Sequence, residues 1–184
     1  MNAQEIIHQL EEPTQNRIPV KQRISETATI EDLIAAMHEP MRPLTRQILC
    51  DILGDRRAAQ ALPDLLEALK DPSPGVRSAA ADALAAIKDV RAGPALLEQY
   101  RAETRSDVRT MLAVALGAVG YQPAIPDLVQ ALDDADDTLQ MEAAWSLGEL
   151  KASEAREGLQ RVLARQKDEY SRNLVQGAIN KLGE

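Results

Sequence analysis

The sequence repeats itself with a period of 31 or 32 residues, and this period constrains the fold more than any other feature of the chain. A proline followed by paired apolar residues recurs at Pro63, Pro94 and Pro126, so successive copies lie 31 and 32 residues apart. A Val-Arg or Leu-Gln pair and then an Ala-Leu or Ser-Leu pair follow at nearly constant distances. Repeats of this length are typical of stacked helical hairpins, which cannot bury their apolar faces alone. The period therefore predicts an all-α solenoid that offers a surface for binding.

The register divides the chain into an N-terminal segment and five repeat units. We expect residues 1–29 to form a helix and a basic linker, and residues 30–184 to form the repeat domain. The predicted units are about 30–62, 63–93, 94–125, 126–156 and 157–184. Each should contain a helix A, a turn and a helix B, with proline at the first position of helix A in three of the units. Thr29 and Asp32 have the spacing of a capping box, which marks the start of the first unit.

The first 29 residues do not follow the period. A short helix ending before Pro13 would carry an apolar stripe of Ile6, Ile7 and Leu10. The next segment, residues 13–24, carries three basic residues and no acid: Arg17, Lys21 and Arg23. Such a segment in an acidic chain can fold back over the chain's own acidic surface. Two interpretations stay open, a helix that caps the first unit followed by a solvated linker, or an arm that binds a partner.

These motifs resemble the HEAT repeat, in the short form of the phycobilisome-lyase-type HEAT-like family. The family pattern is an Ile/Leu-Pro-x-Leu start, an Asp-Pro turn, Val-Arg and Ala-x-x-Leu-Gly. The second unit matches all of it except the final glycine, which is Ala85, whereas the third lacks the Asp-Pro turn and the fourth has Gln140 in place of arginine. The resemblance covers about residues 30–184 and implies a right-handed α-solenoid of about five HEAT-like hairpins. It implies little about function, because this repeat serves many unrelated proteins.

Charge and composition argue against several classes of function. The formal net charge is -8, so repulsion of phosphate backbones makes a nucleic-acid partner unexpected. Cys50 is the only cysteine and cannot form an internal disulfide, which fits a reducing compartment. The N-terminus lacks the features of a signal peptide, and no stretch approaches the ~18–20 apolar residues of a membrane helix. We therefore expect a cytoplasmic protein without membrane contact.

No constellation of residues predicts catalysis, a metal site or a cofactor. His8 and His38 are too few for a histidine-rich metal site, and His38 is expected at the surface or in a turn. Cys50 has no predictable histidine partner and is expected to be a small, partly buried residue of helix B. The acidic run at residues 133–137 lacks the glycine of an EF-hand loop and should instead favour the following helix through its dipole.

Arginines recur in register near the start of helix B, at Arg46, Arg77 and Arg109. HEAT-like DNA glycosylases hold DNA on a basic concave face, but Asp51 and Asp82 share these helices. We expect the arginines to pair with acids in the turns and to connect helix ends between units.

The B helices of HEAT-type arrays line the concave face, and the fourth unit departs from its neighbours there. Met141 and Trp145 lie four residues apart on one helix face, and Val114 occupies the position of Trp145 one unit earlier. We predict a partner-binding cluster formed by Trp145, Met141 and Val114 and rimmed by Asp82, Arg109 and Gln176. The same face is expected to include Cys50, Ala81, Ala113, Ala144 and Val175. The alternative is that Trp145 is buried between adjacent B helices as ordinary packing.

The sequence leaves three functions open. The main hypothesis is a non-enzymatic scaffold or adaptor that binds a protein on its concave face, the partner exposing apolar residues with some basic character. The family resemblance implies a second, a phycobilin lyase-like or chromophore-handling protein acting on phycobiliproteins, which would be an enzyme. The third is an accessory or assembly factor of a larger complex.

Overall fold

The computed structural model of the protein describes residues 1–12 and 17–182. Within these residues the chain forms twelve α-helices and short 3-10 turns, with no strand. The helices fall into two compact units, Met1–Ile87 and Lys88–Glu184, and each unit has its own buried apolar residues. The predicted all-α repeat fold is confirmed. No helix in the described part of the chain is long and apolar enough to cross a membrane.

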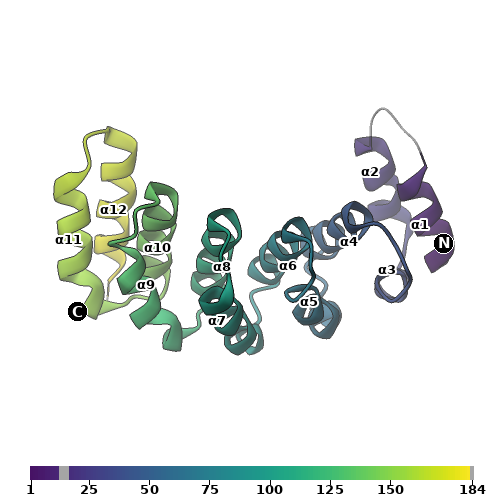
Figure 1. The fold of residues 1–184 in the computed structure, drawn as a ribbon, viewed down its shortest axis with the longest axis horizontal. Helices are drawn as coiled ribbons and strands as arrows, with labels where there is room; N and C mark the ends of the chain where they lie inside the picture. Colours follow the sequence, from purple (N-terminus) through teal and green to yellow (C-terminus); the bar gives the residue numbers. More distant parts are fainter. Residues whose placement is uncertain (13–16, 183–184) are drawn as a thin grey trace. The chain divides into compact units, whose positions relative to one another are not determined.

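The first unit contains two N-terminal helices and two helical hairpins. The N-terminal helices are α1 (Ala3–Glu11) and α2 (Ile18–Thr27). The hairpins are α3 (Ile30–Met37) with α4 (Pro43–Asp55), and α5 (Leu62–Ala68) with α6 (Pro74–Ile87). The two B helices, α4 and α6, lie side by side, and each A helix contacts the B helix that follows it (Figure 1).

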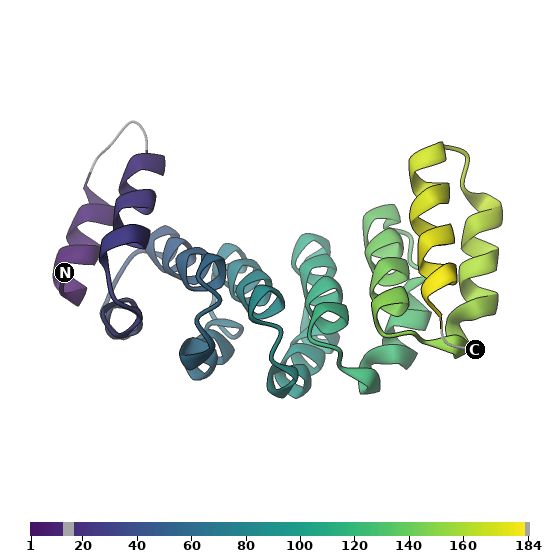
Figure 2. The ribbon, with the colours of Figure 1, turned by 180° about the vertical axis from the view of Figure 1, so that it is seen from behind.

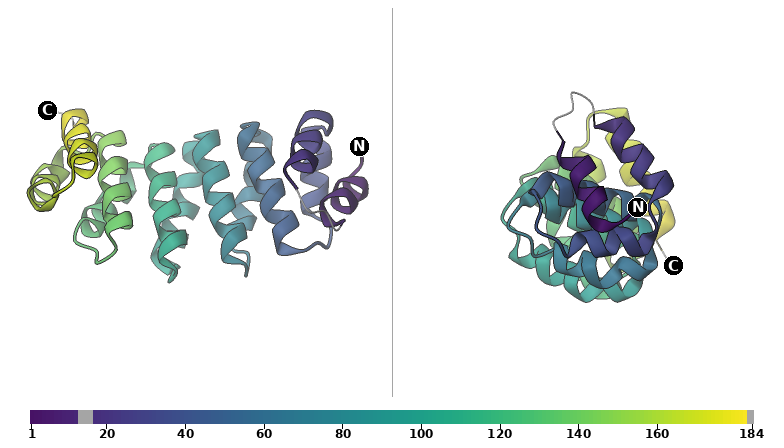
Figure 3. Two further views of the ribbon diagram at one scale, coloured as in Figure 1. Left: turned by 90° about the horizontal axis from the view of Figure 1, so that it is seen from above. Right: turned by 90° about the vertical axis from the view of Figure 1, so that its right-hand side faces the viewer.

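The second unit contains three hairpins. They are α7 (Gly93–Ala102) with α8 (Ser106–Ala118), α9 (Ile125–Ala131) with α10 (Asp137–Glu149), and α11 (Arg156–Arg165) with α12 (Glu169–Lys181). Helix α10 contacts both α8 and α12, so the B helices form one row with α10 in the middle (Figure 2). The view from above shows α8 and α10 running side by side (Figure 3).

The A helices of the repeats begin one residue earlier than their prolines predict. A 3-10 turn precedes α5, α7, α9 and α11, and the α-helix then starts at the residue before each proline in the first three. Pro63, Pro94 and Pro126 therefore occupy the first turn, where a missing N–H group leaves no hydrogen bond unmade.

The basic N-terminal segment is helical where the sequence predicts a linker. That prediction is wrong for residues 18–27, which form α2 with Pro19 in its first turn and Ile24 fully buried. Residues 13–16 of the predicted linker lie outside the described residues. Lys21 Nζ lies 3.0 Å from Asp55 Oδ2 and 3.9 Å from Asp51 Oδ2. The basic segment thus folds over acids of α4, as its charge suggests.

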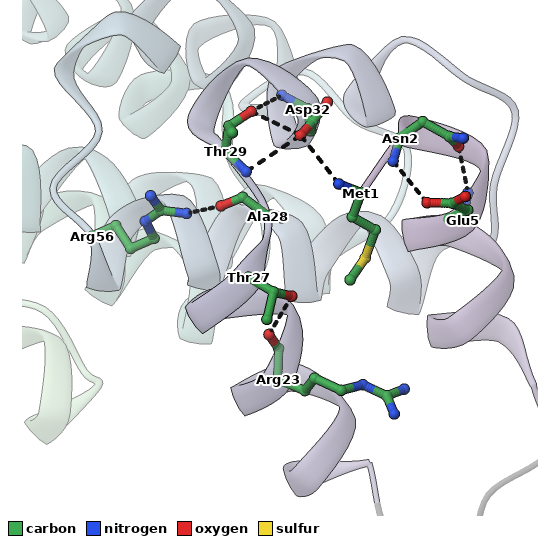
Figure 4. Close-up of polar contacts among 9 residues, drawn as sticks. All are labelled: Met1, Asn2, Glu5, Arg23, Thr27, Ala28, Thr29, Asp32 and Arg56. Carbon is green, nitrogen blue, oxygen red and sulfur yellow. Dashed lines mark hydrogen bonds and ion pairs between the residues drawn. The ribbon is translucent and has the colours of Figure 1, made fainter.

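Capping boxes begin α1 and α3 (Figure 4). The predicted box is confirmed, because Thr29 Oγ1 accepts a hydrogen bond from the Asp32 backbone N–H at 3.1 Å and the Asp32 carboxylate accepts one from the Thr29 N–H at 3.4 Å. The Thr29 hydroxyl also donates to Asp32, and this bond holds the pKa of Asp32 below its usual value. Arg56, at the end of α4, donates to the Ala28 carbonyl at 2.6 Å. Both ends of the first hairpin are therefore tied to one turn.

Adjacent B helices approach closely because small residues line the seams between them. A Cβ atom added to Gly54 would lie 2.7 Å from Ala83 Cα, across the α4–α6 seam. A Cβ atom added to Gly117 would lie 2.7 Å from Ser146 Cα, across the α8–α10 seam. These seams and the one between α10 and α12 bury five residues expected on the concave face, all of them 0% exposed: Cys50, Ala81, Ala113, Ala144 and Val175. That expectation is wrong, because the neighbouring B helix covers them.

A left-handed residue follows the B helices at equivalent positions: Arg57, Lys88, Gly120 and Lys151, with φ angles of 48°, 59°, 74° and 54°. After Arg57, Gly120 and Lys151, the next residue donates its N–H group to a carbonyl five residues back, as Ala152 does to Leu147 at 3.1 Å. Only Gly120 is of a residue type that adopts this region without steric cost.

Candidate partner-binding surface

Helix α10, which carries Met141 and Trp145, begins at a well-formed cap. Asp136 Oδ1 accepts hydrogen bonds from the backbone N–H groups of Thr138 at 2.8 Å and Leu139 at 3.3 Å. Ser106, the first residue of α8, donates its hydroxyl to the same carboxylate. The Ser106 bond is the largest of the effects that hold the pKa of Asp136 below its usual value. The acidic run was predicted to favour this helix through its dipole, and Asp136 does so as the N-cap residue, through hydrogen bonds.

A buried hydrogen bond sets the orientation of α10 against α8. Ser146 is 0% exposed, and its Oγ atom donates to the Ala113 carbonyl at 2.9 Å. Leaving such a buried hydroxyl unpaired would cost about 1–3 kcal/mol, so this bond restrains rotation of α10 about its own axis. Trp145 precedes Ser146 directly, and its direction from the helix is restrained with it.

The three apolar residues of the predicted cluster are neither core nor fully exposed. Met141 and Trp145 on α10 and Val114 on α8 are all half-buried. The alanines beside them, Ala144 and Ala113, are 0% exposed. Close packing between α8 and α10 is thus made by alanine and glycine, and part of each larger side chain stays open to solvent.

The B helices of the first unit carry polar residues at the positions equivalent to this cluster. Their side chains are Gln47 and Asp51 on α4, and Ser78 and Asp82 on α6. Asp82, predicted to rim the cluster, is exposed and belongs to the first unit, whereas the other five predicted residues belong to the second. Gln176 is exposed on α12, and its amide donates to Asn180 Oδ1 at 2.9 Å.

Arg109 contacts a turn acid and a tyrosine ring and does not rim the Trp145 cluster, so its predicted place at the rim is wrong. Its guanidinium carbon lies 5.3 Å from the centroid of the Tyr100 ring, and Nη1 lies 3.4 Å from Asp134 Oδ2. Five residues of an α-helix turn through about 140°, so Arg109 and Val114 point in different directions from α8. The equivalent Arg46 lies 2.6 Å from Asp71 Oδ2. The predicted pairing of the arginines with turn acids is confirmed at both positions.

The fourth unit has a hydrogen bond between uncharged side chains in place of this ion pair. Gln140 stands where the first three units have arginine, and its side-chain oxygen accepts a hydrogen bond from Gln166 Nε2 at 3.4 Å. The contact between hairpins is thereby kept without either charge.

Glu142 is a residue of this surface that the sequence reasoning missed. It is half-buried on α10, three residues before Trp145, and the described part of the chain provides it with neither a hydrogen bond nor an ion pair. Burial raises the pKa of its carboxyl group above the usual value. The equivalent residues in the first unit, Ile48 and Ala79, are buried and apolar. A glutamate in an apolar column was the signal that could have identified it.

Two polar crevices lie between successive A helices at equivalent register positions. The first, about 310 Å³, is lined by His38, Arg46 and Asp64 among others. The second, about 490 Å³, is lined by Tyr100, Arg109 and Asp127 among others. Several of their charged groups pair with one another, as in the contact of His38 Nε2 with Asp64 Oδ1 at 2.9 Å. Neither lining includes Trp145.

The histidine and cysteine considered for catalysis or metal binding, His38 and Cys50, lie in surroundings that favour neither. His38 caps α3 at the surface, as predicted. Cys50 is fully buried, more than the sequence suggests, and burial raises the pKa of its thiol to about 12. A thiol in that state is a poor nucleophile. Among the described residues, no group of three or more His, Cys, Asp or Glu side chains is arranged to hold a metal ion.

Comparison with known proteins agrees with the repeat architecture. The family of HEAT repeats matches residues 30–117 and 94–180. Phycocyanobilin lyase subunit alpha of Nostoc sp. is 29% identical over 148 residues, which are 71% of this chain and 53% of the relative. The chain therefore spans about half the length of that relative.

Solved structures of other proteins show the same repeat architecture. A chain of the CpcE–CpcF complex of phycocyanin lyase from Nostoc sp. PCC7120 has a TM-score of 0.71 and 25% identity, over 97% of this chain and 76% of that one. A designed armadillo repeat protein for modular peptide recognition has a TM-score of 0.68 at 16% identity, over 97% and 99% of the two chains, which is a likeness of fold alone. The chain belongs to the HEAT-repeat family and is similar to a phycocyanobilin lyase subunit.

Proposed function

We propose that this protein binds a partner protein through the B-helix surface of its second unit, with Trp145, Met141 and Val114 at the centre of the contact. The observation that carries the proposal is a half-buried tryptophan on a row of helices whose close packing is already made by alanine and glycine. Partly open tryptophan and methionine side chains on a fixed helix face are typical of the central residues of protein interfaces.

The relatives support a protein as the partner. The CpcE–CpcF structure, one chain of which is 25% identical to this protein, is itself a complex of two proteins. A net charge of -8 favours a partner that carries basic residues.

Replacement of Trp145 by alanine tests the proposal. A central interface tryptophan contributes on the order of 2 kcal/mol or more, so affinity for the native partner should fall at least about 30-fold while the melting temperature changes little. The partner would be captured from lysate of the source cells and its affinity measured by calorimetry. Tyr170→Ala on α12, where the side chain is 77% exposed, is the control for loss of an aromatic residue.

A large loss of folding stability in W145A would contradict the proposal. A fully packed tryptophan replaced by alanine costs about 3–5 kcal/mol of folding stability. If W145A shows that loss, and if binding returns in full at a temperature where the variant is folded, Trp145 is a core residue and the interface lies elsewhere.

A second candidate function, handling of a bilin chromophore, is favoured by the 29% identity to phycocyanobilin lyase subunit alpha. A structure that contains a similar chain, CpcE–CpcF, is a complex of two proteins, so the test includes a candidate second subunit. Mixing the protein with phycocyanobilin and apo-phycocyanin, with and without a candidate second subunit, tests it by absorbance. A spectral shift with transfer to the apoprotein supports the function, and an unchanged spectrum in both mixtures rejects it.

A further inference from the structure

Glu142 lies in the seam between α8 and α10, at the edge of the Trp145 cluster. Ser146, one helical turn further along α10, faces α8 because its hydroxyl bonds to the Ala113 carbonyl and its Cα atom opposes Gly117. Residues four apart share a helix face, so Glu142 lies along the same seam as Ser146. Trp145 follows Glu142 by three residues, which places the indole and the carboxylate next to each other on the helix surface.

The second unit does not supply a cation to this carboxylate. Arg109 on α8 is held by Asp134 and by the ring of Tyr100. Arg172 on α12, which occupies the equivalent of the Met141 position, directs Nη1 to the Gln166 carbonyl at 3.5 Å. Within the part of the chain that the structure describes, Glu142 is a half-buried acid without a partner.

Leaving a carboxylate in this position is unfavourable for the free protein. Its pKa is raised by burial alone, so its charged form has lost part of its hydration and gained no compensating contact. The first unit shows that alanine, as Ala79, fits the same seam position. A group that weakens the free state while lying beside a binding surface is a candidate for recognition.

Resting on the proposed function, we propose that Glu142 receives an arginine side chain of the partner, whose guanidinium group lies over the indole of Trp145. This assigns the partner a basic residue flanked by apolar ones and makes Glu142 the residue that selects for it.

The chemistry favours arginine over lysine. A planar guanidinium can donate two hydrogen bonds to one carboxylate and also stack on an aromatic ring, whereas an ammonium group is a compact and strongly hydrated point charge. Met141 and Val114 would cover the methylene stem of the arginine and exclude water from the ion pair. Exclusion of water strengthens the pairing relative to an exposed salt bridge.

A peptide selection tests the inference even while the native partner is unidentified. A display library of random peptides of about 12 residues would be selected in parallel on the wild-type protein and on E142Q, W145A and E98Q. Glu98 is exposed on α7, so E98Q removes the same charge away from the cluster. We expect arginine beside apolar residues to be enriched on the wild type and on E98Q. On E142Q, apolar residues should remain enriched without arginine.

A double-mutant cycle then measures the contact. In one selected peptide the arginine would be replaced by citrulline, which keeps the shape and removes the charge. Affinity would be read from the fluorescence of Trp145, the single tryptophan of the chain. We expect citrulline to weaken binding about tenfold on the wild type and less than about twofold on E142Q.

The outcomes separate this inference from the function on which it rests. Peptides that require Trp145 but contain no arginine, or equal effects of citrulline on the wild type and E142Q, overturn the role of Glu142 and leave the interface intact. A selection that yields no Trp145-dependent peptide overturns the proposed interface itself.

Discussion

Glu142 is a half-buried acid on the B-helix surface of the second unit, and the described residues supply it with no ion pair. Its carboxyl pKa in the folded protein lies above 4.5, the usual value that it has when the chain unfolds. The folded state therefore holds a proton more tightly than the unfolded state does. Deprotonation of Glu142 therefore lowers the free energy of unfolding as the pH rises from about 4.5 through the raised pKa.

Replacement of Glu142 by glutamine should remove this pH dependence. At pH 7 we expect E142Q to unfold with a free energy higher by on the order of 0.5 kcal/mol, a modest gain because solvent still reaches the group. At pH 4, where the glutamate is largely protonated in both states, the difference should disappear. Urea unfolding followed by circular dichroism at both pH values measures it.

E98Q is the control for the change in net charge, since Glu98 is exposed. The change in stability that E98Q causes at each pH is subtracted from that of E142Q. An equal effect of E142Q at the two pH values would show that the folded state does not perturb its carboxyl group.

At the scale of elements, glycine sets the distance between B helices in one place and not in another. Gly117 lies in the α8–α10 seam, where an added Cβ atom would be 2.7 Å from Ser146 Cα. Gly177, within α12, has no heavy atom within 4 Å of an added Cβ atom. Both glycines lie within B helices, but Gly117 has no room for a side chain and Gly177 has open space.

Alanine at these two positions should change stability in opposite directions. Gly117→Ala forces the helices apart, and we expect a loss of about 1–3 kcal/mol from overpacking. Gly177→Ala fills open space in a helix interior, and we expect a gain of about 0.5–1 kcal/mol from reduced freedom of the unfolded chain. Thermal unfolding of both variants measures this. A destabilised Gly177→Ala would mean that α12 packs more tightly than its surroundings indicate.

The hairpins were predictable and their boundaries only partly so. Proline and apolar spacing define helices A and B because both act locally, within one or two turns. The left-handed residues that end the B helices were not predictable at Arg57 and Lys151, since neither is a residue that favours positive φ. At Gly120 the residue type itself signals the left-handed conformation. At Arg57 and Lys151 no residue type signals it, and the packing of the next hairpin imposes it.

At the scale of the molecule, α1 and α2 complete the core of the first unit. Ile6, Leu10 and Ile24 are at most 1% exposed, and α1 contacts α3 and α4. These helices cover apolar residues of the first hairpin that a preceding repeat would otherwise cover.

Deletion of residues 1–27 should therefore destabilise and expose the first hairpin. We expect a lower melting temperature and self-association, measured by calorimetry and sedimentation velocity. Lys21→Ala, which removes only the ion pairs with Asp51 and Asp55, should cost less than about 1 kcal/mol. A shortened protein that stays monomeric with an unchanged melting temperature would show that the two helices are dispensable for folding.

The limits of prediction for the candidate site have one physical cause. Register places residues around each B helix, so Met141 and Trp145 were correctly assigned to one face. Register does not give the distance between helices, and small side chains such as Ala144 become core when that distance is short. Arg109 was wrongly placed at the rim of the cluster, because it precedes Val114 by five residues and lies on another side of α8, where it reaches the turn acid Asp134.

The burial of Cys50 has a practical consequence. Its thiol is 0% exposed with a pKa near 12, and the chain has no other cysteine. Alkylating reagents should reach it only when α4 separates from its neighbours, so the labelling rate in native buffer reports how often the first unit opens. For the same reason, a cysteine introduced at an exposed position such as Gln176 can carry a spectroscopic probe without removal of the native thiol.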